Sequence, residues 1–424
     1  MPNNYHEIIE ELFSFERAEI KPGLERINVL LKILGNPEYS FKSIHIAGTN
    51  GKGTICNLLA SILQECGMKI GLFTSPHILR FNERIKVNGT EISDEDIVKI
   101  NSFLINDAKN IGATFFEIST AIAFEHFKRS EVDVAIIETG MGGNFDSTNV
   151  LTPILSIITQ IDLDHQEYLG NSLEEIAKEK AGIIKPNVPV IICDNHAELK
   201  KVFIDKAREM RSPIIYVEDN FQISNFIIDE KLNMTCDISD GINLYKSVFL
   251  PVAGTHQTQN LKAIIAAYNY LKFHYPLNEE VLYSGLRNVK KNTGFNSRID
   301  LISNSPIIIV DVAHNPAGIG KLVECIDLSP LSKHKFNIYF AAMKDKDIKS
   351  MLAILLPITN VLNIIQLDNK RAAQSSEIEK IAIELGFSSI KLWDNPKESF
   401  NDINKDSIIC GSFYTIEAFY NTQK

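Results

Sequence analysis

The chain has 424 residues, with 43 lysines and arginines against 53 aspartates and glutamates, so its formal net charge is −10. At about 150 residues per domain this length predicts two or three domains, and a composition of 45% hydrophobic and 23% charged residues excludes a largely disordered chain. The acidic balance excludes nucleic acid as the main partner, because phosphate backbones are bound by basic surfaces, but it allows a small anionic ligand in a locally positive site.

The first part of the chain alternates helices and strands. Apolar spacing predicts a helix over residues 23–35 and another from Thr54 to Cys66. Short apolar runs predict strands from Phe41 to Ile46 and from Ile70 to Phe73. A glycine-rich loop joins the first strand to the second helix, so these segments predict a β-loop-α-β unit.

Further strands are predicted by near-continuous apolar runs over Val132 to Ile137, Ile154 to Ile161 and Val188 to Ile192. Runs of this kind are typical of a parallel sheet covered on both faces. Between the last two strands, Ser172 and Glu175 form a capping box that opens a helix to about residue 181.

The residue pattern changes over residues 213–250, where short runs of alternating apolar and polar residues, broken by Asp, Asn and Gly, predict antiparallel hairpins. A helix from about His256 to Leu271 follows, and the polar segment 290–297 predicts a domain boundary. We therefore expect an α/β domain over residues 1–293 with a β-rich insertion near 213–250, and a smaller α/β domain over 294–424. The strands predicted in the second domain lie near 307–311, 336–340, 361–366 and 407–410.

The cysteines and the chain start indicate the compartment. Six scattered cysteines with no C-x-x-C pair indicate reduced thiols in a cytosolic protein. The first seven residues lack the basic and apolar regions of a signal peptide, and no apolar run approaches the ~18 residues that cross a membrane. We expect a cytoplasmic protein that does not bind a membrane.

The strongest motif lies between the first predicted strand and the following helix and reads Gly48-Thr49-Asn50-Gly51-Lys52-Gly53-Thr54. Glycines let several backbone N–H groups point at one anion, the helix N-terminus adds positive potential, and the lysine reaches the phosphate. The spacing differs from G-x-x-x-x-G-K-[ST], and a tight glycine turn with a surface lysine is the alternative. The order of strand, loop, lysine and helix favours a phosphate loop.

A second group of polar residues follows the ends of predicted strands, where open α/β sheets bind ligands. The group consists of Ser75, Glu138, Asp162, Asp164 and His165. Taken singly, each is more often a cap or a solvated loop residue. A nucleotide phosphate needs Mg²⁺, which takes oxygen ligands and keeps several waters, so the joint position of these residues favours a metal site.

These motifs together resemble the folylpolyglutamate synthase/dihydrofolate synthase family of the ATP-dependent Mur ligase superfamily, from about residue 24 to residue 415. The resemblance implies a Mur ligase-like architecture: a large P-loop NTPase-like parallel-sheet domain followed by a smaller Rossmann-like α/β domain. The segments that carry it are 48–54, Thr74-Ser75-Pro76-His77, Phe81-Asn82-Glu83-Arg84-Ile85, Asp164-His165, Glu179-Lys180-Ala181-Gly182-Ile183 and Asp311-Val312-Ala313-His314-Asn315-Pro316.

The resemblance implies roles around the nucleotide. Lys52 and its loop would hold the β- and γ-phosphates of ATP, Ser75 and Glu138 would bind one Mg²⁺, and His165 would bind a second. Lys180 matches a lysine that family members carry as a carbamate formed with CO₂. By spacing alone, Lys180 would be an ordinary helix-end lysine favoured by the macrodipole. We also expect a monovalent cation as a further cofactor.

The remaining matched residues contact nucleotide, glutamate or pterin in the family. Asn260, Arg298 and Asp311 match nucleotide contacts, and His314 and Ser412 match the region that receives glutamate. Arg84 matches a substrate-side arginine, and Arg371 lies in an Arg-Ala element. Phe116, Glu117 and Asp146 lie in segments that resemble the pterin side. For the two arginines of the substrate side and the Arg-Ala element, a solvated cation is the alternative. One departure is Asn144, which stands where the family usually has arginine and removes a cation near the pterin side.

The implied activity is the ATP-dependent addition of L-glutamate to dihydropteroate and to tetrahydrofolate, through an acyl phosphate that a closing cleft protects from water. Segments 114–117 and 146–149 resemble members that carry out both reactions. A monofunctional member, a Mur-type cell-wall peptide ligase and a non-catalytic nucleotide-dependent switch are the alternatives. Segments 75–77 and 81–85 argue against the peptide ligase, and 311–316 would be idle in a switch. Because the cleft needs no second chain, we expect a monomer.

Overall fold

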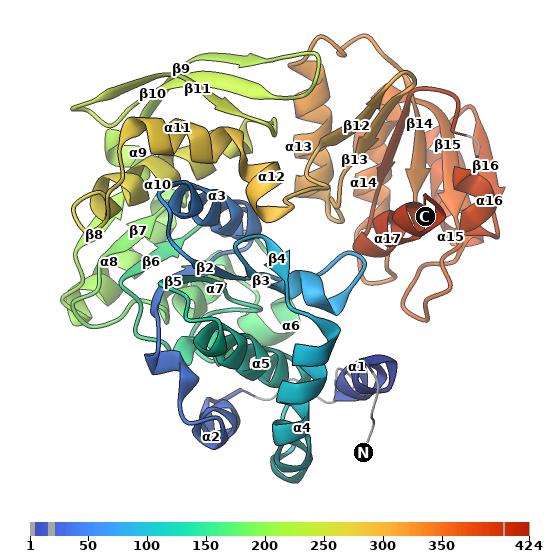
Figure 1. Ribbon diagram of the computed structural model, residues 1–424. Coiled ribbons are helices and arrows are strands. Elements are labelled where there is room, and N and C mark those ends of the chain that lie inside the picture. The colour runs from blue at the N-terminus through green and yellow to red at the C-terminus, as the bar shows by residue number, and fades with distance from the viewer. Residues whose placement is uncertain (1–4, 16–21, 402, 424) are drawn as a thin grey trace. The chain divides into compact units, whose positions relative to one another are not determined.

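The structure of the protein is a computed structural model that describes residues 5–15, 22–401 and 403–423 (Figure 1). Residues 1–4, part of the segment in which no signal peptide is predicted, lie outside the described residues. The chain forms two compact units. The first comprises residues up to 222, 238–245 and 259–295, and the second comprises 223–237, 246–258 and 296 onward.

The first unit is built on an eight-stranded sheet with the order β4-β3-β2-β5-β1-β6-β7-β8. The strands β2, β5, β1, β6, β7 and β8 pair parallel in that order, whereas β3 pairs antiparallel with β2, and β4 pairs antiparallel with β3. The central strands are buried along nearly their whole length, as their apolar runs predict. The bounds are β1 Lys42–Ala47, β2 Ile70–Phe73, β3 Ile85–Val87, β4 Thr90–Glu91, β5 Val134–Glu138, β6 Leu155–Ile158, β7 Val190–Ile192 and β8 Ile214–Tyr216.

Helices cover both faces of this sheet, with α3, α10 and α11 above it and α5 and α7 below it in Figure 1. The helix predicted from His256 to Leu271 has those bounds, and the helix predicted from Thr54 begins two residues earlier, at Lys52. The helices are α1 Tyr5–Ser14, α2 Glu25–Ile33, α3 Lys52–Glu65, α4 Asp94–Ile111, α5 Phe115–Arg129, α6 Gln166–Leu169, α7 Leu173–Ala181, α8 Lys200–Glu209, α9 Val217–Asn220, α10 His256–Leu271, α11 Glu279–Arg287 and α12 Val289–Thr293. Short 3₁₀ turns are η2 Pro37–Tyr39, η3 Phe81–Arg84, η4 Ser147–Val150 and η5 Ala197–Leu199.

The β-rich segment differs in part from the prediction of hairpins over 213–250. Its first strand, β8, pairs parallel with β7 and belongs to the large sheet, so the prediction is wrong there. The rest forms a three-stranded sheet, β11-β10-β9, whose strands are β9 Gln222–Ile228, β10 Met234–Ser239 and β11 Leu244–Leu250. The physical reason is the crossover helix α8, which returns the chain parallel to β7 before the short strands begin.

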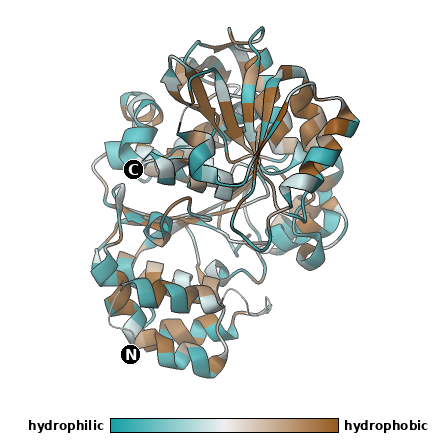
Figure 2. Cartoon of the chain, turned by 90° about the vertical axis from the view of Figure 1, so that its right-hand side faces the viewer, coloured by the Kyte–Doolittle hydropathy of each residue, from teal (hydrophilic) through white to brown (hydrophobic). Residues whose placement is uncertain are grey.

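The second unit has a six-stranded sheet with the order β12-β13-β17-β14-β15-β16, in which β12 pairs antiparallel with β13 and the other neighbouring strands pair parallel. The strands are largely brown in Figure 2, whereas the flanking helices show both teal and brown residues. The elements are β12 Asp300–Asn304, β13 Ile307–Val310, α13 Pro316–Asp327, β14 Phe336–Phe340, α14 Ile348–Leu355, η6 Leu356–Ile358, β15 Thr359–Ile365, α15 Ser375–Leu385, β16 Ile390–Trp393, α16 Pro396–Phe400, β17 Ser407–Cys410 and α17 Phe413–Thr422.

Two strands of this sheet, β12 and β16, were not predicted from the sequence. Both lie at sheet edges and are largely half-buried or exposed, so neither has the continuous apolar run of a central strand. The observed α/β architecture, with a large parallel sheet and a second α/β unit, agrees with the predicted fold class. No helix in the described part of the chain is both long and apolar enough to span a bilayer.

Candidate active site

The phosphate loop connects β1 to α3. Gly48 has φ 152° and Gly51 has φ 91°, backbone conformations that favour glycine. A Cβ atom at Gly48 would collide with Thr159, and one at Gly51 would lie 2.5 Å from Asn260 Oδ1. Because α3 begins directly after the loop, its first N–H groups face the space in which a phosphate can bind.

The loop is held by the segment that follows β6. The Thr49 hydroxyl accepts from Asp162 N at 3.0 Å, and Asn50 Nδ2 donates to Asp162 Oδ2 at 2.7 Å. Backbone Gln160 O accepts from Thr49 N at 2.8 Å, and Thr159 Oγ1 donates to Asn50 O at 2.6 Å. Asp162, one of the acidic residues singled out as strand-end candidates, therefore supports the loop. This also explains why β6 ends at Ile158 and not at Ile161 as predicted: the backbone leaves the ladder to pair with the loop.

Two lysines converge on the same carbonyl of the loop. Lys52 Nζ donates to Gly48 O at 2.9 Å and to Thr49 O at 3.1 Å, and Lys180 Nζ donates to Gly48 O at 2.7 Å. Lys180 is only 4% exposed, and burial, with a smaller contribution from Lys52, lowers its pKa to about 7. A lysine 132 residues along the chain from Gly48 is thus brought to the phosphate loop as a buried amine.

Ser75 and Glu138 lie together at the carboxyl ends of β2 and β5. Ser75 N donates to Glu138 Oε2 at 3.1 Å, and Glu138 is 4% exposed. A Cβ at Gly53, in the first turn of α3, would lie 3.6 Å from the same carboxylate oxygen. One carboxylate and one hydroxyl beside a phosphate loop are a donor set that fits Mg²⁺, which takes oxygen ligands and completes its shell with water and phosphate. Among the described residues, no three His, Cys, Asp or Glu side chains gather at one point to hold a metal ion by themselves.

His165, the predicted ligand of a second Mg²⁺, precedes the short helix α6 with φ 50°. Its side chain is about half exposed, and Nε2 lies 3.5 Å from Asp164 Oδ2. Nearby, Asn260 on α10 is 5% exposed and lies against the loop glycine Gly51. The structure therefore brings Asn260 to the phosphate loop and leaves the His165 ring at the surface.

Arg84, at the end of η3, is 7% exposed and lies with its guanidinium 5.1 Å from the centroid of the Phe115 ring. Its Nε donates to His77 Nδ1 at 2.7 Å, which requires a neutral imidazole. Burial and the adjacent guanidinium lower the pKa of His77 to about 3, so the imidazole keeps this acceptor at neutral pH. Phe116, the neighbour of Phe115 in α5, stacks on Phe73 at the end of β2, with ring centroids 5.7 Å apart.

Two of the predicted pterin-side residues have local structural partners. Glu117 caps α5 by accepting from Thr114 N at 2.7 Å, and Arg26 Nε donates to it at 3.1 Å. Asp146 is 6% exposed and caps η4 by accepting from Thr148 N. Sequence reasoning assigned both to substrate, and their packing shows that each also organises its own segment.

In the second unit, three predicted residues gather at the carboxyl ends of β13 and β17. Asp311 is buried and accepts from Ile299 N at 2.6 Å and from Ala313 N at 2.7 Å. Burial raises the pKa of Asp311 to about 6, although nearby Arg298 acts in the opposite direction. The rings of His314 and Phe413 are 5.6 Å apart, and Arg298 lies 5.5 Å from the centroid of Phe413.

Ser412, predicted to meet glutamate, is the N-cap of α17. Its hydroxyl accepts from Thr415 N at 3.0 Å and lies 2.8 Å from Thr415 Oγ1. Arg371, in the Arg-Ala element, has an exposed side chain that lies 3.9 Å from Asp345. Sequence reasoning did not assign roles to Phe413 and His77, although Phe413 follows Ser412 directly and His77 lies in a quoted motif. Adjacency to matched residues is the signal that could have identified both.

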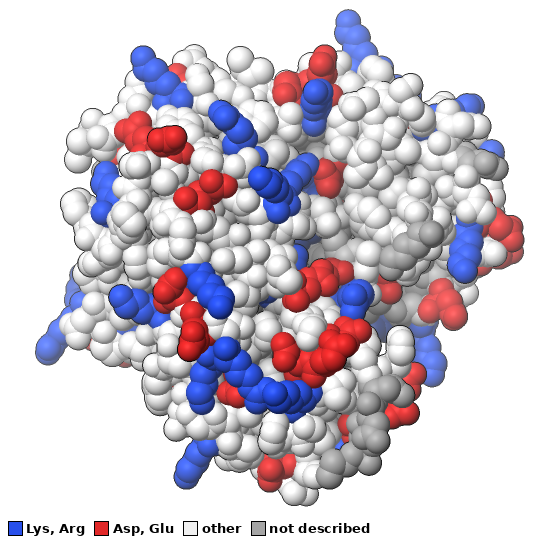
Figure 3. Space-filling view, in the orientation of Figure 1, with Lys and Arg blue, Asp and Glu red and all other residues white. Residues whose placement is uncertain are grey.

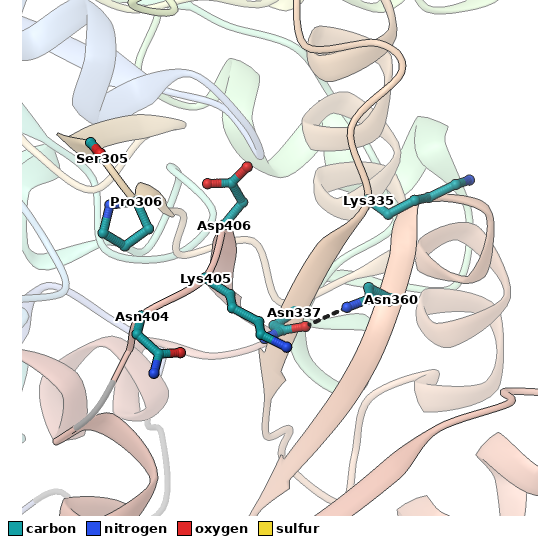
Figure 4. Close-up of a pocket in the computed structure, with 8 residues that line it drawn as sticks. All are labelled: Ser305, Pro306, Lys335, Asn337, Asn360, Asn404, Lys405 and Asp406. Carbon is teal, nitrogen blue, oxygen red and sulfur yellow. Dashed lines mark hydrogen bonds between the residues drawn. The ribbon is translucent and has the colours of Figure 1, made fainter.

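A polar depression of about 530 Å³ lies elsewhere in the second unit, at the amino ends of β13, β14, β15 and β17 (Figure 4). Its walls bond to one another: Asn360 Nδ2 donates to Asn337 Oδ1 at 3.0 Å, and Ile307 N donates to Asp406 Oδ1 at 2.9 Å. Parallel sheets bind ligands at the opposite, carboxyl edge, so we do not assign this depression to the active site. The lining residues are Ser305, Pro306, Lys335, Asn337, Asn360, Asn404, Lys405 and Asp406.

The distribution of surface charge indicates that anions are attracted at particular sites and not by the protein surface as a whole. On the face drawn in Figure 3, lysine and arginine side chains are interspersed with aspartate and glutamate. The net charge of −10 is therefore compatible with an anionic ligand only where cations such as Lys52 and Lys180 meet a helix N-terminus.

Comparisons with known proteins agree with this geometry. The pattern of the Mur ligase middle domain matches residues 46–268. A dihydrofolate synthase/folylpolyglutamate synthase of Bacillus subtilis (strain 168) is 36% identical over 415 residues, which cover 94% of each chain. The folylpolyglutamate synthase of Lacticaseibacillus casei is 32% identical over 441 residues, covering 99% of this chain and 98% of its own.

Solved structures show the same likeness over the whole chain. The folylpolyglutamate synthase of Thermotoga maritima has a TM-score of 0.87 and 30% identity, and the match covers 98% of this chain and 96% of that one. Escherichia coli FolC, solved in complex with DHPP and ADP, has a TM-score of 0.86 and 26% identity, with 100% and 99% covered.

Proposed function

The chain belongs to the dihydrofolate synthase/folylpolyglutamate synthase family of Mur ligases, and on that premise we propose that it adds L-glutamate to both dihydropteroate and tetrahydrofolate. It is an ATP-dependent ligase. The observation that carries the proposal is the phosphate loop on which Lys52 and Lys180 converge. Segments 114–117 and 146–149, which resemble bifunctional members, support the two-substrate form.

The loop and Lys52 serve phosphoryl transfer. An oxygen of the substrate carboxylate attacks the γ-phosphorus of ATP, the bond to the bridging oxygen breaks, and ADP leaves. Backbone N–H groups at the start of α3 and the Lys52 ammonium hold the phosphates and balance charge as it moves to the leaving group. Mg²⁺ held by Glu138 and Ser75 would add electrostatic stabilisation of the transferring phosphoryl group.

The second step forms the amide bond. The uncharged amine of glutamate attacks the acyl carbon of the acyl phosphate, inorganic phosphate leaves, and the nitrogen loses a proton. We assign Arg298 and Asp311 to the nucleotide and His314 to the glutamate. The contacts within the second unit support this, because all three residues lie at the carboxyl edge of one sheet. Asp311 directly follows β13, and Arg298 and His314 lie beside Phe413.

Lys180 is proposed to act as a carbamate. Forming a carbamate requires an uncharged amine that attacks CO₂ and releases one proton, and an ordinary lysine is almost fully protonated at neutral pH. Burial lowers the pKa of Lys180 to about 7, which supports the reaction. The product is an anion beside the phosphate loop, where it would help to hold a metal ion.

The experiment is release of inorganic phosphate from the purified protein with ATP, Mg²⁺ and glutamate. Dihydropteroate, tetrahydrofolate and a UDP-muramyl peptide are added in turn. We expect glutamate-dependent release with the first two. Release with only one of them makes the protein monofunctional, release with only the peptide makes it a cell-wall ligase, and release with none supports a nucleotide-dependent switch.

A further inference from the structure

His45 is an unusual residue for its place in the fold. It lies within β1, between Ile44 and Ile46, and is 0% exposed. Its Nε2 lies 2.8 Å from Thr148 Oγ1, and its Nδ1 bonds to none of the described residues. An aliphatic side chain at this position would pack without leaving a buried polar atom unpaired, so the histidine calls for an explanation beyond packing.

The neighbouring contacts determine the direction of the hydrogen bonds. Thr148 Oγ1 donates to Asp146 Oδ1 at 2.5 Å. Since a hydroxyl has one proton, the Thr148 oxygen can only accept from His45, which must carry its proton on Nε2. Burial lowers the pKa of His45 to about 3, with a further contribution from Lys185, so the ring stays neutral. A directed chain therefore runs from His45 through Thr148 to the Asp146 carboxylate.

The Asp146 carboxylate, at the end of this series of hydrogen bonds, holds the loop 141–146. Besides the Thr148 hydroxyl, the carboxylate accepts from Thr148 N at 3.0 Å and from Met141 N at 2.9 Å, which closes the segment 141–146. The same segment packs on the end of α7, because a Cβ at Gly143 would lie 2.8 Å from Glu179 O. Capping η4 requires only the bond from Thr148 N, so the hydroxyl and the imidazole serve a purpose other than the cap.

We propose that His45 and Thr148 are positioning residues that fix the Asp146 carboxylate and the 141–146 loop for the pterin part of the substrate. The inference rests on the proposed function, in which Asp146 lies on the pterin side. It assigns no contact with substrate to His45, which acts from β1 through Thr148. The phosphate loop follows the same strand, but its hydrogen bonds to the segment after β6 go to Thr159, Gln160 and Asp162 and not to His45, Thr148 or Asp146.

The test compares Thr148→Val, which keeps the shape and removes the hydroxyl, with Thr148→Ser, which keeps the hydroxyl. His45→Leu and His45→Gln form a second pair, since glutamine retains an N–H donor. Initial rates give KM for dihydropteroate and KM for ATP separately, and melting temperatures show that each variant is folded. We expect Thr148→Val and His45→Leu to raise KM for dihydropteroate about tenfold, and Thr148→Ser and His45→Gln to stay within about twofold of wild type.

Several outcomes overturn the proposal. One is an equal rise in KM for dihydropteroate in the valine and serine variants, and another is a parallel rise in KM for ATP, which indicates a purely structural role. A third is an Asp146→Asn variant with unchanged KM for dihydropteroate. If the wild type uses tetrahydrofolate but not dihydropteroate, the two-substrate function fails, and the same variants are measured with tetrahydrofolate, which carries the same kind of ring.

Discussion

Replacing Lys180 with methionine should make the protein more stable at neutral pH while abolishing turnover. Lys180 is buried at 4% exposure and its pKa falls from 10.5 to about 7, chiefly because burial penalises the charged form and secondarily because Lys52 is near. Methionine has a similar length and carries no charge, so it removes the cost of burying an ammonium group. The predicted trade of stability for function is common at sites built for chemistry.

The magnitude follows from linkage. A lysine whose pKa is depressed in the folded state contributes stability that is present above about pH 10.5 and lost as the pH falls to about 7. In that window the stability of wild type should rise with pH by up to about 1.4 kcal/mol per unit relative to Lys180→Met, and by a few kcal/mol in all. The same shift raises the uncharged fraction of the amine at neutral pH about a thousandfold, which is what a reaction with CO₂ requires.

The assay is urea unfolding of wild type, Lys180→Met and a control in CO₂-free buffers from pH 7 to pH 10. The control is Lys178→Met on the same helix, where an exposed lysine pairs with Glu174 at 2.7 Å. The control should follow wild type. An identical pH dependence in wild type and Lys180→Met would refute the reasoning, since it would mean that Lys180 ionises as freely in the folded chain as in the unfolded one.

Activity gives a second readout of the same residue. Lys180→Ala should lose turnover and regain part of it when a short carboxylate such as acetate is added, if a carbamate is the working group. With ¹³C-labelled bicarbonate, wild type should show a carbamate carbon resonance that Lys180→Ala lacks. Full activity in the alanine variant would remove Lys180 from the site.

Four further variants test other parts of the site. Glu138→Gln should require about tenfold more Mg²⁺ for half-maximal phosphate release, because it removes the only charge of the proposed donor pair. Asp162→Ala should raise KM for ATP several-fold, because it frees Asn50 and loosens the loop. Arg84→Lys should raise KM for dihydropteroate and not KM for ATP, since lysine lacks the planar fork of guanidinium. The pKa of Asp311 is raised from 3.8 to about 6, so this carboxyl contributes stability that is present below pH 4 and lost by about pH 7. In Asp311→Asn, the fall in the free energy of unfolding between these pH values, measured by chemical denaturation, should be smaller by up to about 3 kcal/mol.

Each of these has an outcome that contradicts it. An unchanged Mg²⁺ requirement excludes Glu138 from the metal site, and an unchanged KM for ATP shows that the loop holds its shape without Asp162. A rise in KM for ATP alone would place Arg84 on the nucleotide. If Asp311→Asn follows the pH dependence of wild type, the carboxyl titrates with an ordinary pKa in the folded protein.

Local patterns in the sequence predict local structure well where the physical signal is strong. The helix from His256 to Leu271 and the strands β2, β14 and β17 have the predicted bounds, because a buried helix or central strand needs a sustained apolar pattern. Edge strands such as β12 and β16 lack that pattern. The capping box at Ser172 likewise forms as predicted, since its partners are three residues apart.

By itself the sequence determined that this is an acidic α/β chain with a phosphate loop after its first strand, and its motifs indicated the family. Only the tertiary structure decided which groups distant in the sequence meet: the Lys180 amine with the backbone carbonyl of Gly48, Asn50 with Asp162, and His45 with Thr148. The reason is range. Periodicity and turn chemistry act over a few residues. Burial depends on segments about a hundred residues apart, which pack together only when the whole sheet forms, and the shifted pKa values and buried hydrogen bonds follow from that burial.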